Sequence, residues 1–168
     1  MASKSKQPKI HVPPEPIDIW ITRAAFGILL LMFGTAAYYF NQLPERIPIH
    51  FNVKGDPDGY GSKNMIWALP ILSTVMFLGM WKVSSIPHLY NYQGKITEEN
   101  AEHQYRMASR MMRVLNLTIM IMFCYMVWIS IRVALGNSGG LGSFFLIITL
   151  VGTGLIPLYF ILQLSKNK

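Results

Sequence analysis

Four polar side chains that could bind a ligand lie in one short segment between two apolar stretches. They are His50, Asn52, Asp56 and Asp58. Imidazole, amide and carboxylate groups can ligate a metal ion or recognise a small molecule, and a histidine beside acids can also serve acid–base catalysis. The run from Asp56 to Gly59 is similar to the start of a calcium loop, but tryptophan stands at position 67, where such a loop needs its bidentate glutamate. A structural turn or a ligand-recognition loop is therefore favoured over a metal site.

Local patterns predict that this segment is ordered. Residues 47–53 alternate, with Ile47, Ile49, Phe51 and Val53 on one side and Pro48, His50 and Asn52 on the other. Such alternation is typical of a half-buried strand. The following Gly-Asp-Pro-Asp-Gly at 55–59 is dense in turn-forming residues. We expect the apolar side to pack on the rest of the protein, so that the polar side faces the aspartates of the turn, solvent or a ligand.

The composition indicates a membrane protein. Of the 168 residues, 52% are hydrophobic and only 14% are charged, whereas soluble domains carry roughly 25% charged residues. Apolar runs cover residues 19–40, 65–83, 114–135 and 141–164, and each is close to the ~20 residues that span a bilayer. Backbone groups must be paired internally in lipid, so these runs should be helices. The predicted fold is an all-α integral membrane protein, a single domain over residues 1–168 with four transmembrane helices.

The basic residues predict the orientation of these helices. Residues 1–16, 84–113 and the carboxyl terminus carry an excess of lysine and arginine, whereas residues 41–64 have three basic and three acidic side chains. The positive-inside rule then places both termini and residues 84–113 in the cytoplasm and makes 41–64 an outer loop. The net charge of +7 is therefore interpreted as a topology signal and a means of contacting anionic lipids, and not as a sign of nucleic-acid binding.

The cytoplasmic segment before the third span is predicted to be helical. Thr97 followed by acids is a typical helix start, and no breaker separates it from the third span. One long helix over about residues 96–135 is expected. Arg106, Arg110 and Arg113 fall on one face of it, where we expect them to contact anionic lipid headgroups at the inner face of the membrane.

Arg132 is a fifth candidate for ligand binding and lies near the outer end of the third span, where a guanidinium needs an anion. The sequence predicts a direct or water-bridged contact with Asp56 or Asp58, which would dock the outer loop onto the third span. Pro70 and Pro157 lie inside the second and fourth spans, where each would be expected to kink its helix.

The outer segment resembles a known family. The similarity lies in Leu-Pro at 43–44, Ile-Pro-Ile-His-Phe-Asn at 47–52 and Gly-Asp-Pro-Asp-Gly-Tyr-Gly-Ser-Lys at 55–63, which leads into the second apolar run. This order resembles the bacterial domain-of-unknown-function family at the amino-terminal part of SdpI-like membrane proteins, over about 45 residues from the first span into the second. SdpI itself is an immunity protein against a secreted killing factor and signals to a cytoplasmic repressor. The resemblance implies membership of this family and a location in the bacterial plasma membrane.

The predicted function is a binding, sensing or immunity-type module, or an accessory subunit of a membrane complex. The alternatives are a small transporter or channel-like component, and a membrane enzyme that acts on a lipid. The spans lack acidic residues between the headgroup zones, and no nucleophile motif, phosphate-binding loop or HExxH motif is present. We therefore predict no catalytic residue, metal ligand or cofactor. The expected partners are the lipid bilayer and a membrane protein or a second copy of the chain.

Overall fold

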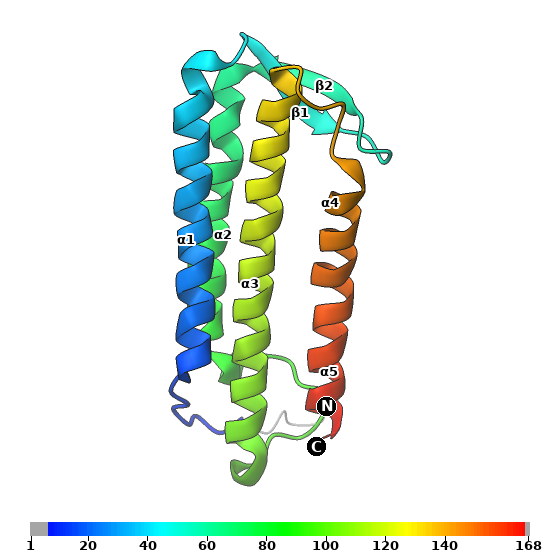
Figure 1. The fold of residues 1–168 in the computed structure, drawn as a ribbon. Coiled ribbons are helices and arrows are strands. Elements are labelled where there is room, and N and C mark those ends of the chain that lie inside the picture. Colours follow the sequence, from blue (N-terminus) through cyan, green and yellow to red (C-terminus); the bar gives the residue numbers. More distant parts are fainter. Residues whose placement is uncertain (1–6, 167–168) are drawn as a thin grey trace, which may run out of the picture.

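In the computed structural model, which describes residues 7–166, helices run side by side in an elongated bundle and a β-hairpin covers one end (Figure 1). The helices are α1 (Pro16–Tyr39), α2 (Ala68–Ser84), α3 (Glu98–Ala134), α4 (Gly142–Thr149) and α5 (Ile156–Lys166). A π-helical segment, Leu150–Leu155, joins α4 to α5, and the three together are called the fourth helix. Short 3₁₀ turns lie at Phe40–Gln42, Lys63–Trp67 and Pro87–Leu89. The strands are β1 (Arg46–Phe51) and β2 (Pro57–Ser62).

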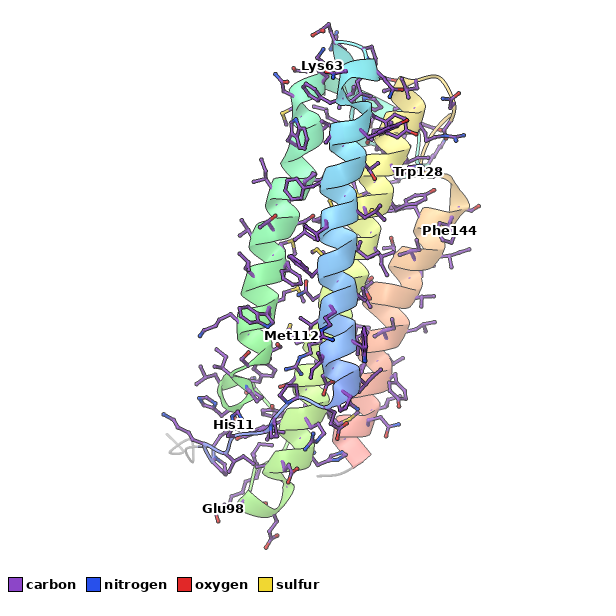
Figure 2. All side chains as sticks on the ribbon, turned by 60° about the vertical axis from the view of Figure 1, so that its left-hand side comes forward. His11, Lys63, Glu98, Met112, Trp128 and Phe144 are labelled. Carbon is purple, nitrogen blue, oxygen red and sulfur yellow. The ribbon has the colours of Figure 1, made fainter. Side chains whose placement is uncertain are left out.

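Within residues 7–166, four helices are long and apolar enough to cross a membrane, as the sequence predicts. They cover Pro16–Gln42, Lys63–Ser84, Glu98–Ala134 and Gly142–Ser165. We call the end covered by the hairpin, where Lys63 lies, the hairpin end, and the opposite end, where Glu98 lies, the base (Figure 2). The most apolar window of the fourth helix is only 11% buried within the protein. This exposure suits a helix that is surrounded by lipid.

The helix α3 is the centre of the bundle, because α1, α2 and the fourth helix all pack against it. It runs unbroken over 37 residues, as expected from the sequence. The hydroxyl of Thr97 accepts a hydrogen bond from Asn100 N at 3.4 Å, and the side-chain oxygen of Asn100 accepts one from Thr97 N at 2.9 Å. This capping box satisfies amides that the first turn leaves free. The fourth helix approaches α3 closely at Gly152, where a Cβ would overlap the Thr118 methyl.

The two prolines act differently from the expected kinks. Pro70 is the third residue of α2 and follows the 3₁₀ turn Lys63–Trp67 closely, and the first turn of an α-helix tolerates proline. Pro157 lies just after the π-helical segment, which widens the fourth helix over one turn. A π-helical turn is one way in which a helix absorbs a local irregularity.

The hairpin is antiparallel, and its register shifts on both sides of His50. These bulges change which way the side chains point. Ile47 is buried at 1% exposure, but Ile49 is 48% exposed and Val53 is 97% exposed. The expectation that all four apolar side chains of 47–53 pack on the bundle is therefore wrong, and the strand ends at Phe51 rather than at 53.

Ion pairs join the start of α1 to α3 at the base. Asp18 is 1% exposed and accepts a hydrogen bond from Arg110 Nε at 2.8 Å. Glu15 accepts one from Arg110 Nη2 at 2.5 Å and lies 3.1 Å from Arg106 Nη1, and Arg106 Nη2 also lies 2.7 Å from Glu102. Acids of the chain itself thus bind Arg106 and Arg110, and the expected contact of these arginines with lipid headgroups stays a prediction.

The segment before α1 adds to these contacts at the base. Tyr105 on α3 donates a hydrogen bond to the carbonyl of Pro8 at 2.8 Å, and Val12 packs against Ile96 and Tyr105. The described part of the amino-terminal segment is thus attached to α3.

Arg113 differs from the other two arginines. It makes no hydrogen bond or ion pair with any residue of 7–166, and its lipid-headgroup contact also stays a prediction.

Replacing Arg110 with glutamine should strongly destabilise the protein. The change leaves the buried Asp18 carboxylate without its guanidinium, and breaking such a pair costs about 3–5 kcal/mol. Thermal unfolding of the purified protein in one detergent measures the effect. Arg113→Gln is the matched control and should cost much less, and adding Asp18→Asn to Arg110→Gln should recover part of the loss. Equal losses for Arg110→Gln and Arg113→Gln would contradict the role of the pair.

Candidate ligand-binding site

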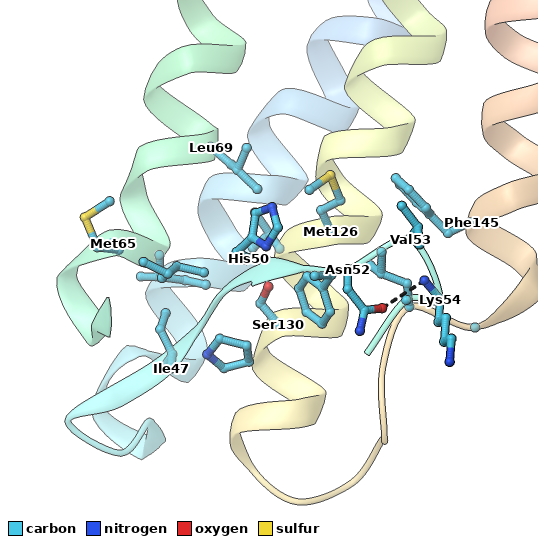
Figure 3. A pocket seen from close by; sticks show the side chains of 18 of the residues that line it. Ile47, His50, Asn52, Val53, Lys54, Met65, Leu69, Met126, Ser130 and Phe145 are labelled. Carbon is cyan, nitrogen blue, oxygen red and sulfur yellow. Dashed lines mark hydrogen bonds between the residues drawn. The ribbon is translucent and has the colours of Figure 1, made fainter. Parts of the chain in front are cut away.

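A cavity of about 860 Å³ lies beneath β1 at the hairpin end (Figure 3). The strand and its turn form the roof, α3 forms the back, and the starts of α2 and α4 form the two walls. The lining is mostly apolar and includes Leu69 on α2, Met126 on α3 and Phe145 on α4. No extensive packing joins the walls α2 and α4. The cavity is therefore a groove that is open along the side of the bundle.

His50 in the roof forms a polar pair with Asp58, which itself lies outside the cavity lining. Nδ1 of His50 lies 2.5 Å from Oδ1 of Asp58 on the other strand. Figure 3 shows the imidazole turned toward the side of the cavity on which Leu69 and Met126 lie. The imidazole is still 71% exposed, which agrees with an open groove. Gly59 lies opposite His50 in the hairpin, where a Cβ would come within 2.9 Å of the His50 Cβ, so the small residue lets the two strands approach at the pair.

The other two polar residues of the loop do not join this pair. The side-chain oxygen of Asn52 accepts hydrogen bonds from the backbone amides of Lys54 at 2.8 Å and Asp56 at 3.1 Å. Asn52 therefore closes the turn, which is a common role of asparagine. The Asp56 side chain is exposed and takes no part in these bonds. Within residues 7–166 no three His, Cys, Asp or Glu side chains gather as a metal site requires.

The expected ion pair of Arg132 with Asp56 or Asp58 does not form. Arg132 Nη2 donates a hydrogen bond to the carbonyl of Asn137 at 2.9 Å, and the guanidinium lies 5.4 Å from the ring centre of Trp128. The reason is local, because the chain turns directly after α3 ends at Ala134 and brings the carbonyl of Asn137 next to Arg132.

The hairpin is docked instead by backbone contacts. The carbonyl of Gly55, at the tip of the hairpin, accepts a hydrogen bond from Leu141 N at 2.8 Å. The Tyr125 hydroxyl on α3 donates to the Leu141 carbonyl at 2.6 Å. Gly55 has φ +87, and a Cβ at Gly140 would overlap the Gly55 carbonyl oxygen. Glycine at both positions therefore allows the close approach that holds the roof over the cavity.

Sequence reasoning missed the cavity walls and Ser130. Ser130 lies on α3 at the back of the cavity and is 8% exposed. Its position inside an apolar run carries no sign of a binding role, because serine in such runs commonly mediates contacts between helices. No signal in the sequence distinguishes it from the other hydroxyls of the spans.

A second, smaller cavity of about 250 Å³ lies at the base, between residues 90–96, α3 and α5. Tyr90 and Tyr92 line it, and their rings stack with centroids 6.2 Å apart. Burial raises the pKa of Tyr90 to about 12 and raises the pKa of Tyr92 as well. Both phenols therefore stay protonated at neutral pH and act here as neutral groups.

Residues 27–74 match the family model of a domain of unknown function, DUF1648. The matched segment runs from α1 through the hairpin into α2, so it contains the roof and one wall of the cavity but neither α3 nor α4. No curated protein matches the chain, and no solved structure matches it.

Replacing Gly140 with alanine should loosen the hairpin. The added methyl group overlaps the Gly55 carbonyl oxygen, and a forced displacement of this kind costs about 1–3 kcal/mol. Thermal unfolding in detergent should therefore show a lower melting temperature. Gly139→Ala is the neighbouring control, because a Cβ at Gly139 meets nothing within 4 Å. If both variants melt like the wild type, the close approach of Gly140 to the hairpin does not hold the roof.

Proposed function

We propose that this protein is a binding module of a bacterial plasma membrane that receives an amphiphilic ligand in the groove beneath its hairpin. The observation that carries the proposal is a mostly apolar cavity whose roof contains His50, which is paired with Asp58. Its volume falls in the range of roughly 300–1,000 Å³ that is usual for small-molecule sites. Apolar walls with a few polar groups are also the usual composition of such sites.

The proposed orientation places the hairpin outside and the base in the cytoplasm. The base carries the basic side chains of residues 95–113 and the end of α5, whereas residues 41–64 have balanced charges. The positive-inside rule therefore favours cytoplasmic termini. In this orientation the groove lies at the depth of the outer leaflet, and its open side between α2 and α4 faces lipid. A ligand can then enter sideways from the membrane, with its chain against Leu69, Met126 and Phe145 and its polar head below the His50–Asp58 pair.

The sensing or immunity-type form of this proposal rests on α3. This helix lines the groove through Met126 and Ser130 and continues without a break to the base, where its first turns hold the amino-terminal segment. A change of packing in the groove would act on the same rigid element as the contacts at the base. The resemblance of residues 43–63 to SdpI-like proteins supports an immunity-type role in which the bound ligand is removed from its target.

The orientation is tested with single cysteines in a Cys124→Ser background. Cysteine at Ser62, which is exposed on the hairpin, should react in intact cells with a thiol reagent that cannot cross membranes. Cysteine at Asn91, which is exposed at the base, should react only after the cells are opened. The reverse pattern would place the groove in the inner leaflet and overturn the proposed orientation.

The groove is tested by photolabelling. The purified protein in lipid nanodiscs is exposed to a trace of monotetradecanoylglycerol with a diazirine near the end of its chain. We expect labelling around Met126 and Phe145 that an excess of the same lipid without the diazirine suppresses, because a defined site saturates. Mass spectrometry of the labelled peptides locates the reaction.

Two tryptophan variants serve as a matched pair in this assay. Leu69→Trp fills the groove and should abolish the saturable labelling. Leu72→Trp, on the same helix but 47% exposed and outside the cavity lining, should leave it intact. Labelling that is spread evenly over the outer faces of the helices and does not saturate would refute a binding function for the groove.

A further inference from the structure

The hydroxyl of Ser130 is an unused hydrogen-bonding group at the back of the groove. Ser130 is 8% exposed and lines the cavity, and it makes no hydrogen bond with any residue of 7–166 (Figure 3). Several other hydroxyls in the long helices donate to the carbonyl four residues earlier, as Thr74, Thr118 and Thr149 do at 2.8–3.0 Å. Ser130 lacks this internal bond although it lies in a regular helix.

A hydroxyl in this position needs a partner that arrives with the ligand. The hydroxyl is open to the groove, and a polar group that lipid chains cover without a hydrogen bond is costly. The simplest complement is an acceptor that adds no charge and needs no partner of its own. A carbonyl group meets both conditions, because it accepts the Ser130 proton and can lie next to an apolar chain.

The order of groups along the groove indicates where this carbonyl lies in the ligand. His50, which is paired with Asp58, is in the roof, and α3 runs from the base toward it. Ser130 is four residues closer to the roof along α3 than Met126, which corresponds to about 6 Å along a helix. From the roof downward the groove therefore presents a polar pair, then a hydrogen-bond donor, then apolar walls.

We propose that the ligand is a single-chain acyl compound, in which an ester or amide carbonyl follows a polar head and precedes an apolar chain. The Ser130 hydroxyl donates to that carbonyl, the His50–Asp58 pair binds the head, and Met126 and Phe145 contact the chain. This inference rests on the proposed binding function and adds the chemical class of the ligand.

The test compares two probes that differ only in the carbonyl. Monotetradecanoylglycerol has an ester carbonyl, and tetradecyl glycerol ether has the same head and nearly the same chain without it. Each competes against the photoactivatable lipid in nanodiscs, and the half-saturating concentration is measured. The wild type should bind the ester about threefold to tenfold more tightly than the ether, the ratio expected for one net hydrogen bond.

Ser130→Ala should lower affinity for the ester to that for the ether and leave the ether unchanged. Ser143→Ala, which removes another hydroxyl from the cavity lining, should keep the preference. Melting temperatures of both variants confirm that they fold. Equal saturable binding of ester and ether to the wild type, or a preference that survives Ser130→Ala, would overturn the carbonyl assignment while the binding function stands. Absence of saturable competition by either probe would overturn both.

Discussion

The hydrogen bond between the carbonyl of Gly55 and Leu141 N determines the shape of the hairpin end. It joins the tip of the hairpin to the loop between α3 and α4, and no other strand within residues 7–166 supports this two-stranded sheet. An isolated hairpin is marginally stable, so it depends on what it packs against. Ile47 anchors one end of β1 in the core, and the Gly55 contact anchors the other. The strand between these two anchors is held across the bundle as the roof of the groove.

The base is held by a different kind of interaction. There the buried Asp18 carboxylate and the guanidinium of Arg110 tie the start of α1 to α3. Buried ion pairs are costly to separate even where they add little net stability, so they fix one arrangement of the two helices. The fourth helix has no such link among the described residues and is the least buried of the long helices. The bundle thus combines a rigid set of α1, α2 and α3 with a fourth helix that forms one wall of the groove.

The sequence predicted the parts of this structure that depend on local pattern and hydropathy. The length of the apolar runs predicts the four long helices, a capping residue predicts the helix start at Thr97, and turn-forming residues predict that the outer loop is ordered. The sequence did not predict the bulges around His50, because they depend on how the strand meets the bundle. Strict alternation therefore assigned Ile49 and Val53 to the wrong surface. The partners of Arg110 and Arg132 also depend on tertiary distances. Asp18 lies 92 residues before Arg110, and only the packing of α1 on α3 brings them together.

The apolar character of the groove has a consequence for how it can distinguish ligands. A sealed cavity of this size would cost stability through lost contacts. In the proposed orientation the groove opens toward lipid and has no such cost, because lipid chains fill it. Those chains are as apolar as leucine side chains, so contact with Leu69 or Phe145 gives a ligand little advantage over bulk lipid. Any selectivity must come from polar groups. In the groove these are His50 with its partner Asp58, Asn52 and Lys54 in the roof, and the hydroxyls of Ser130 and Ser143 below it. Since Ser143 is exposed and Ser130 is not, the buried hydroxyl is the donor that competing water reaches least.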